Sequence, residues 1–269
     1  MRKILVLGCS GSGKSTFAVK LHNVTGLPLF HLDNVWWRPD RTHISRDEFD
    51  AKLEELIDHD SWIIDGDYSR TYERRIAACD TIVFLDYGEE VCMKGIIGRI
   101  GQKRGDIPWI ENELDPELVE LVKKYESENK PLLLELFNRY PEKCVITLHS
   151  RDDADHWLIK NCVIGSVVKG TVDRPLGSTH PNHSDMIYPI NYGYVKGVIA
   201  GDGQEQDVYI LGTDKPIEMF EGKVIAVYHR FDDVEDKWIV SLDGSDYSDD
   251  EILQTIHFQE QYYEGELVR

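Results

Sequence analysis

Apolar positions in the first 160 residues alternate between short continuous runs and stretches of helical spacing. Continuous runs fall at residues 4–7 and 81–85, whereas apolar residues recur every three or four positions after the helix-start signal at Ser45–Glu48. Strands that alternate with helices predict a parallel sheet covered on both faces. The other predicted strands are 27–33, 62–64 and 145–148, and a helical basic stretch is expected around Arg99, Lys103 and Arg104.

From about residue 163 the pattern changes to short strand-like runs separated by Gly, Pro and Asp clusters. This spacing predicts a small closed β-barrel of the OB type. Ser248 and Glu251 form a capping box, which predicts a C-terminal helix. We therefore predict two domains, an α/β domain at 1–162 and a barrel at 163–269. The expected strand runs lie at 167–172, 187–188, 208–210, 224–227 and 238–240.

The composition is that of a globular protein with a substantial core. The chain has 269 residues, of which 41% are hydrophobic and 29% charged. Since no apolar run is long enough for a membrane span and no signal peptide is recognised, we expect a cytoplasmic protein without a membrane partner. The five cysteines include no C-x-x-C pair, which favours reduced thiols.

The net charge of −19 is unevenly divided. Residues 163–269 carry 20 acidic against 8 basic side chains, a net of −12. This charge argues against direct nucleic-acid binding, because phosphate backbones require a cationic surface. Acid-rich clefts suit Mg²⁺, although part of the charge can simply solvate the surface. The expected partners are nucleotides and other small phosphate compounds, and the sequence leaves a homo-oligomer open.

A phosphate-loop motif lies between the first predicted strand and the helix that follows it. The motif G-x-x-x-x-G-K-[ST] requires this strand-to-helix context. Its glycines let backbone N–H groups surround a phosphate chain at the helix N-terminus. Lys14 is predicted to reach the β/γ-phosphates, and Ser15 to bind Mg²⁺. The residues predicted to bind ATP are Gly8, Ser10, Gly11, Ser12, Gly13, Lys14, Ser15 and Thr16.

Residues 1–160 resemble a known branch of kinases. The phosphate loop, Asp33 after the second strand, and residues 63–66 resemble the adenylate-kinase-like P-loop proteins. More closely, residues 8–16, 31–33, 62–68 and 150–151 resemble the DNA topology modulation proteins of that branch. The resemblance implies ATP-dependent phosphoryl transfer to a small phosphorylated or hydroxylated acceptor.

Several residues acquire expected roles in this reaction. Asp33, at a strand end, is placed to meet the substrate or else serves as a helix cap or turn residue. By resemblance, Asp65 orients Mg²⁺ through water, and Arg70 grips an acceptor phosphate. Arg99 and Arg104 resemble lid arginines that stabilise the transferring phosphoryl group, with ordinary surface salt bridges as the alternative. Arg151 is expected to stack on adenine or to cap a helix.

The second domain resembles another family. Residues 188–194 and 202–208 resemble motifs of the soluble, Mg²⁺-dependent inorganic pyrophosphatases. Residues 232–237 resemble the second acidic cluster of that family, and 257–258 with Tyr262 resemble its C-terminal helix. The resemblance implies hydrolysis of pyrophosphate or a related phosphoanhydride.

This hydrolysis needs cations that neutralise both phosphates and activate a water molecule. Carboxylates that converge in a barrel mouth hold Mg²⁺ for this purpose. The predicted metal ligands are Asp202, Asp207, either Asp232 or Asp233, and either Asp236 or Glu235. Tyr192, Lys237 and Tyr262 are expected to bind phosphate oxygens.

The second domain departs from this family at several positions. Gln204 replaces a third aspartate, Asp173 replaces a glutamate, and Tyr263 stands where a lysine is expected. A hairpin that carries basic residues is predicted to be missing between Ser178 and Tyr188. Losing these charged contacts should weaken the binding of metal ions and of pyrophosphate. The candidate replacements are Arg174, His180, His183 and Lys196.

The two resemblances predict a bifunctional enzyme. Two alternatives remain at this point. Either a non-catalytic P-loop domain regulates a hydrolase, or neither half is catalytic and the chain is an ATP sensor.

Overall fold

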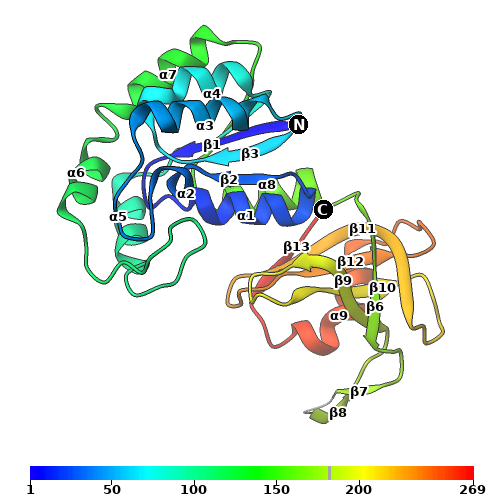
Figure 1. Cartoon of the computed structure of the whole chain (residues 1–269). Coiled ribbons are helices and arrows are strands. Elements are labelled where there is room, and N and C mark those ends of the chain that lie inside the picture. Colours follow the sequence, from blue (N-terminus) through cyan, green and yellow to red (C-terminus); the bar gives the residue numbers. More distant parts are fainter. Residues whose placement is uncertain (181–182) are drawn as a thin grey trace. The chain divides into compact units, whose positions relative to one another are not determined.

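The computed structural model describes residues 1–180 and 183–269, including all side chains except those of residues 183–185 (Figure 1). The chain divides into two compact units, Met1–Ala154 and Asp155–Arg269. The sequence placed the domain boundary at 162/163. Helix α8 (Arg151–Leu158) continues directly into a π-helical turn, Ile159–Val163, without an extended linker. The boundary at 162/163 stays a prediction.

The first unit contains the expected parallel sheet of five strands. The strand order is β2-β3-β1-β4-β5, and every neighbouring pair is parallel. The middle strand β1 is almost entirely buried, as its apolar run predicts. The strands are β1 (Lys3–Gly8), β2 (Leu29–His31), β3 (Trp62–Asp65), β4 (Thr81–Leu85) and β5 (Cys144–Leu148).

Helices cover both faces of this sheet. In Figure 1, α3, α4 and α7 lie on one face and α1 lies on the other. Ser45 caps α3 and Asp115 caps α6, each by accepting a backbone N–H bond. The helices are α1 (Lys14–Thr25), α2 (Leu32–Trp36), α3 (Arg46–Asp58), α4 (Tyr72–Ala78), α5 (Glu89–Gly98), α6 (Pro116–Lys124) and α7 (Asn129–Arg139), with a 3₁₀ turn at Ser69–Thr71.

Two local predictions in this unit were wrong. Strand β2 ends at His31, so Asp33 lies in the first turn of α2 instead of at the strand end. The basic stretch around Arg104 is not helical beyond Gly98, because α5 ends there and Gly101 adopts a left-handed φ of 77°.

The second unit contains the expected closed barrel. The order β12-β10-β9-β6-β11 closes through the pairing of β11 with β12, and β13 extends the sheet beside β11. Pairing is antiparallel except between β10 and β12. The strands are β6 (Val167–Arg174), β9 (Asn191–Ile199), β10 (Glu205–Leu211), β11 (Met219–Arg230), β12 (Lys237–Ser241) and β13 (Gly265–Val268).

The C-terminal helix and a short hairpin complete this unit. Helix α9 (Asp249–Glu260) begins at the predicted capping box, and its Ile252 and Ile256 are fully buried in the barrel core. The hairpin predicted to be missing after Ser178 is present in short form, because β7 (Thr179–His180) pairs with β8 (His183–Ile187). It contains no lysine or arginine.

The described residues include no helix with the length and apolar character required to cross a bilayer.

Candidate functional sites

The phosphate loop follows β1 and packs closely against α5. Gly8, Gly11 and Gly13 have positive φ angles, which side chains rarely adopt. A Cβ atom on Gly11 would lie 2.0 Å from the carbonyl oxygen of Cys92, so the loop backbone and α5 are in direct contact. The remaining predicted residues, Ser10, Ser12 and Thr16, lie in this loop or in the first turn of α1.

Lys14 and Ser12 point into the fold at this loop. The Nζ atom of Lys14 donates a hydrogen bond of 2.9 Å to the carbonyl oxygen of Cys9. Ser12 is buried, and its Oγ has no hydrogen-bond partner among the described residues. Leaving a buried hydroxyl without a partner costs free energy of folding. An oxygen of a bound phosphate could accept a hydrogen bond from it.

Two predicted carboxylates lie at the end of β3 and in the first turn of α2. Asp65 accepts a hydrogen bond from His31 at 2.7 Å, and Asp33 accepts one from the Tyr68 hydroxyl at 2.7 Å. Burial and the charge of Asp65 raise the pKa of Asp33 against the effect of Tyr68. Burial opposes protonation of His31, but its bond to Asp65 leaves its pKa raised. The roles of Asp33 toward a substrate and of Asp65 toward Mg²⁺ stay predictions.

Arg70 lies away from these carboxylates. Its guanidinium is half exposed and makes two contacts with Asp50 of α3, at 2.8 and 2.5 Å. Arg75, in the following helix α4, is buried instead and donates to the carbonyl oxygens of Gly66 and Tyr68. Sequence reasoning missed Arg75, since nothing in the local pattern distinguishes it from its neighbours. The role of Arg70 toward an acceptor stays a prediction.

Arg99 and Arg104 lie next to each other between α5 and α6. Both contact Glu111, through Arg99 Nε at 2.8 Å and Arg104 NH1 at 2.8 Å. Arg104 also pairs with Asp106, whose Oδ1 accepts from Nε at 2.9 Å. Burial and the neighbouring Arg104 lower the pKa of Arg99. The two arginines are therefore paired with acids of their own segment, and their role in a lid stays a prediction.

Asp106 is a second residue that sequence reasoning missed. Burial raises its pKa, but Arg104, with a smaller contribution from the Ser15 hydroxyl, lowers it further than burial raises it. The isolated acid in a loop gave no sequence signal. Only the folded chain buries it beside Arg104.

Arg151 begins α8 and is exposed. The side chain that caps this helix belongs to Ser150, which accepts a bond from the N–H of Asp153 at 3.0 Å. The proposed capping role of Arg151 is therefore filled by its neighbour, and stacking on adenine stays a prediction.

In the barrel, three predicted residues converge from three strands. The hydroxyl of Tyr192 and the ammonium of Lys237 both donate to Asp207 Oδ2 at 2.6 Å. Lys237 also contacts Glu235 at 2.5 Å, and Glu235 accepts the N–H of Asp207 at 3.0 Å. Glu235 had been weighed against Asp236. The structure makes Glu235 the neighbour of Lys237. In the sequence Glu235 lies two residues before Lys237, and alternate residues of an extended chain point to the same side.

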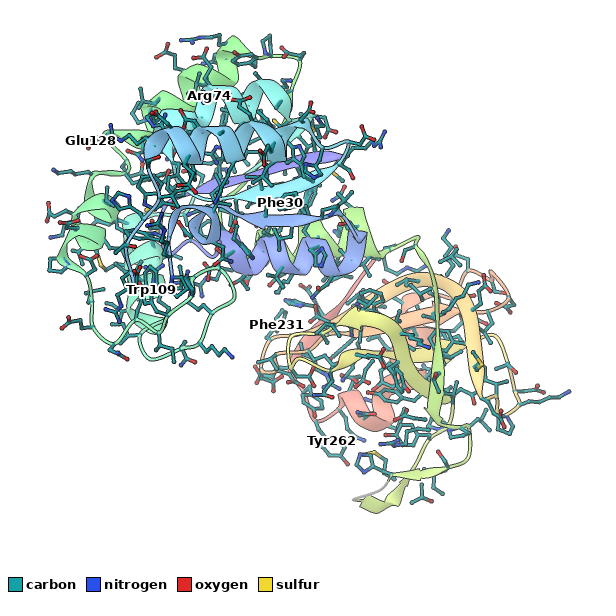
Figure 2. All side chains as sticks on the ribbon, viewed as in Figure 1. Phe30, Arg74, Trp109, Glu128, Phe231 and Tyr262 are labelled. Carbon is teal, nitrogen blue, oxygen red and sulfur yellow. The ribbon has the colours of Figure 1, made fainter. Side chains whose placement is uncertain are left out.

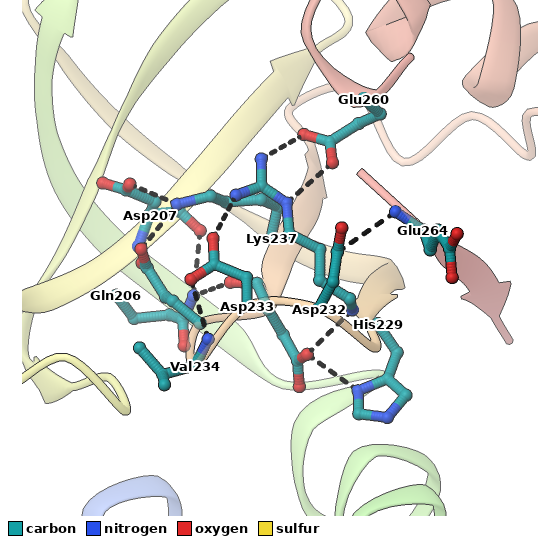
Figure 3. Close-up of polar contacts among 12 residues, drawn as sticks. Gln206, Asp207, His229, Asp232, Asp233, Val234, Lys237, Glu260 and Glu264 are labelled. Atoms are coloured by element: carbon teal, nitrogen blue, oxygen red, sulfur yellow. Dashed lines mark hydrogen bonds and ion pairs between the residues drawn. The ribbon is translucent and has the colours of Figure 1, made fainter. Parts of the chain in front are cut away.

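The other predicted metal ligands face different partners (Figure 3). Asp233 contacts Arg230 at 2.7 Å, Asp236 contacts His229 at 2.7 Å, and Asp232 accepts the N–H of Glu264 at 3.1 Å. Asp202 accepts the N–H of Gln204 within its own turn. Across the part of the chain that the structure describes, no group of three or more His, Cys, Asp or Glu residues is arranged to hold a metal ion.

Comparison with known proteins finds a family match in the barrel region. Residues 165–264 match the model of the inorganic pyrophosphatase family. Soluble inorganic pyrophosphatase 2 of Chlamydomonas reinhardtii is 33% identical over 112 residues, which are 37% of this chain and 57% of that protein. The chain thus spans little more than half the length of this curated relative.

Two solved structures are similar to different parts of the chain. The inorganic pyrophosphatase of Neisseria gonorrhoeae aligns over 39% of this chain and 80% of its own, with 21% identity and a TM-score of 0.30. The shikimate kinase of Acinetobacter baumannii aligns over 60% of this chain and 92% of its own, with 16% identity and a TM-score of 0.42.

A buried ion-pair network supports α9 in the pyrophosphatase-like region. Arg230 donates to both carboxylate oxygens of Glu260, at 2.8 and 2.7 Å, and Tyr209 donates to the same carboxylate. The guanidinium carbon of Arg230 lies 3.4 Å from the ring centroid of Tyr263. Tyr263, which stands where a lysine was expected, therefore stacks on a buried cation. Tyr262 is 68% exposed and lies on the surface in Figure 2.

The candidate replacement cations are only partly near this site. Arg174 contacts Asp173 at 2.6 Å, and burial and the charge of Asp207 raise the pKa of Asp173 against the opposing effect of Arg174. His180 stacks on Tyr188 with ring centroids 6.1 Å apart. Lys196 is exposed on β9, and the side chain of His183 lies outside the described residues.

The donor chemistry beside Lys237 fits Mg²⁺. Asp173, Asp207 and Glu235 offer carboxylate oxygens, which this cation prefers. The charge of Asp207 raises the pKa of both Asp173 and Glu235, although burial contributes most and Lys237 opposes the shift at Glu235. Such repulsion between carboxylates is what a divalent cation relieves. Asp207 and Glu235, which both contact Lys237, are the two candidates to hold it.

Proposed function

We propose that the barrel region hydrolyses inorganic pyrophosphate or a related phosphoanhydride with Mg²⁺. The observation that carries the proposal is the convergence of Tyr192, Asp207 and Lys237 within the residues that match the pyrophosphatase family. Bound Mg²⁺ would supply charge neutralisation and a water of lowered pKa.

The side chains around this site have distinct proposed tasks. Asp207 and Glu235 would hold the cation. Lys237 would donate to a phosphate oxygen as a positive charge. Burial and the charge of Asp207 raise the pKa of Tyr192 well above its usual range, so its hydroxyl keeps its proton at neutral pH and can donate as well. Five other predicted residues have side chains that face elsewhere, and we propose only a minor contribution to metal or phosphate binding for them. They are Asp202, Asp232, Asp233, Asp236 and Tyr262.

The test is phosphate release from pyrophosphate in the presence of Mg²⁺. Asp207→Asn keeps the size of the side chain but removes its charge, so we expect loss of phosphate release. Asp214→Asn, at an exposed turn, is the matched control and should retain the activity. If Asp207→Asn releases phosphate from pyrophosphate at the wild-type rate, the proposed site is wrong.

For the first unit we propose ATP binding and phosphoryl transfer to a small acceptor. The support is the phosphate loop with Lys14, together with Asp33, Asp65 and the paired arginines near it. Titration calorimetry with ATP, comparing the wild type with Lys14→Ala, tests binding. Equal affinity in the two proteins would contradict this proposal.

A further inference from the structure

Strand β6 has an irregularity where it passes the pyrophosphatase-like site. Val172 is paired with Gly193 and Arg174 with Tyr192, so Asp173 is an extra residue of β6 and forms a β-bulge. Successive residues of a regular strand point to opposite faces of the sheet. A bulge interrupts this alternation, and bulges are common next to active sites, where they redirect a side chain.

The bulge places Arg174 directly opposite Tyr192 on the neighbouring strand β9. Residues directly opposite each other in an antiparallel pair lie on the same face of the sheet, with Cβ atoms roughly 5 Å apart. Tyr192 donates to Asp207 of β10, and Lys237 of β12 donates to the same carboxylate, each at 2.6 Å. Because β12, β10, β9 and β6 are neighbours in that order, the four residues form one row with a cation at either end.

The backbone that follows Arg174 is anchored as well. The N–H of Leu176 donates to the side-chain oxygen of Asn191 at 3.0 Å, and Asn191 is fully buried. The N–H of Gly177 donates to the carbonyl oxygen of Tyr188 at 2.8 Å. Arg174 is therefore fixed by β9 and by the residues just before β9, which is what a side chain that positions a substrate requires.

The guanidinium of Arg174 is only partly satisfied by its neighbours. Its Nη1 atom donates to the carboxylate of Asp173 at 2.6 Å. Its Nε atom is buried and has no hydrogen-bond partner among the atoms that the structure describes. A buried donor without an acceptor costs free energy. A phosphate bound beside Tyr192 supplies an acceptor when the guanidinium turns toward it.

We propose that Arg174 binds one phosphate of a diphosphate substrate while Lys237 binds the other, with Tyr192 between them. The strands of the two cations are three spacings of about 4.8 Å apart, which two long side chains and a diphosphate can bridge. Orthophosphate, with one phosphorus, is bound by Lys237 alone. Arg174 thereby sets the preference of the barrel for a diphosphate over a monophosphate. This inference rests on the proposed hydrolysis of pyrophosphate by the barrel.

The test follows hydrolysis of radiolabelled pyrophosphate with Mg²⁺ by the full chain, with unlabelled orthophosphate as an inhibitor. Arg174→Gln should raise the KM for pyrophosphate roughly 10- to 100-fold, as expected for the loss of a charge-assisted contact, and should leave kcat within about threefold. The inhibition constant of orthophosphate should not change, because Lys237 is intact. Lys169→Gln, in the same strand with a side chain that is 71% exposed, is the control and should behave as the wild type.

The outcomes separate this inference from the function on which it rests. If the wild type releases no phosphate from pyrophosphate, the proposed hydrolysis fails and the inference fails with it. If the wild type is active but Arg174→Gln keeps the wild-type KM, hydrolysis stands and the role of Arg174 is wrong. The same conclusion follows if the KM and the inhibition constant of orthophosphate rise together, because a general distortion of the site affects both.

A second variant covers the case in which Arg174→Gln does not fold. Arg174→Lys keeps the positive charge but lacks the planar guanidinium, with which arginine binds two phosphate oxygens at once. We expect a KM for pyrophosphate that is several-fold above the wild-type value, with an unchanged inhibition constant for orthophosphate. A KM equal to that of the wild type would overturn the contact between the guanidinium and a phosphate.

Discussion

Arg75 and Arg74 are neighbours in α4 that make opposite kinds of contact. Arg75 is fully buried and donates to two backbone carbonyls and the Thr71 hydroxyl. Arg74, labelled in Figure 2, is exposed and pairs with Asp50 and Glu54 on the surface. Burial lowers the pKa of Arg75 to about 10, which still leaves it charged at neutral pH. Its role is to hold the backbone after β3.

We predict that Arg75→Met destabilises the first unit by about 2 to 5 kcal/mol, because buried carbonyls lose their donors. Arg74→Met should cost less than about 1 kcal/mol, since exposed ion pairs contribute little. Hydrogen exchange of the β1 amides reports the free energy of unfolding of this unit. Equal effects of the two substitutions would show that Arg75 is not structural.

A second prediction concerns the protonation of Asp50. Hydrogen bonds from Arg70 and Arg74 lower its pKa to about 2, against a small effect of burial. Because the folded pKa is depressed, the ion pair stabilises the fold above the unfolded pKa near 4, and this contribution is lost as the pH falls toward about 2.

Arg70→Gln should raise the pKa of Asp50 only part of the way, because Arg74 still contacts it at 3.0 Å. Carboxyl chemical shifts followed by NMR during an acid titration measure this change. Arg139→Gln, on α7, serves as the control and should leave Asp50 unchanged. An unaltered Asp50 titration in Arg70→Gln would mean that the two side chains do not pair in solution.

At the scale of elements, the contact between α5 and the phosphate loop depends on glycine. A Cβ atom on Gly95 would lie 1.9 Å from the carbonyl oxygen of Gly11, whereas one on Gly98, in the same helix, would meet nothing within 4 Å. The close approach therefore fixes one face of α5 and leaves its end unconstrained.

We predict that Gly95→Ala costs about 1 to 3 kcal/mol through overpacking and weakens ATP binding, because α5 must move away from the loop. Gly98→Ala should instead be neutral or stabilise by up to about 1 kcal/mol, since alanine favours helix. Thermal unfolding and ATP titration calorimetry of both variants make the comparison. A Gly95→Ala protein that matches Gly98→Ala in both measurements would rule out the tight contact.

At the scale of the whole molecule, each candidate site is built within its own unit. Lys14 bonds within the phosphate loop, and the partners of Asp207 all belong to residues 155–269. Two activities that share no side chain should respond separately to mutation.

We therefore predict a crossed result. Lys14→Ala should weaken ATP binding and leave pyrophosphate hydrolysis unchanged. Asp207→Asn should abolish pyrophosphate hydrolysis and leave ATP binding unchanged. Both are measured on the full chain by calorimetry and phosphate release. If ATP alters the hydrolysis rate of the wild type and Lys14→Ala removes that effect, the first unit regulates the second, and the reading of two independent activities is wrong.

The sequence by itself determined the features that depend on near neighbours. The buried run of β1, the glycines of the phosphate loop and the capping box at Ser248 each act over a few residues, and the structure contains all three. The alternation of strands and helices, followed by short strands alone, likewise predicted the parallel sheet and the closed barrel. These signals are local, because backbone geometry and strand or helix periodicity are local properties.

Only the tertiary structure decided which distant side chains meet. It buries Arg75 while Arg70 remains at the surface and buries Asp106 beside Arg104. It also directs Asp232, Asp233 and Asp236 to partners away from Asp207. Residues of the same type in one segment look equivalent in sequence. They differ only once packing selects which of them loses water, since a buried charge must find a partner and an exposed one need not.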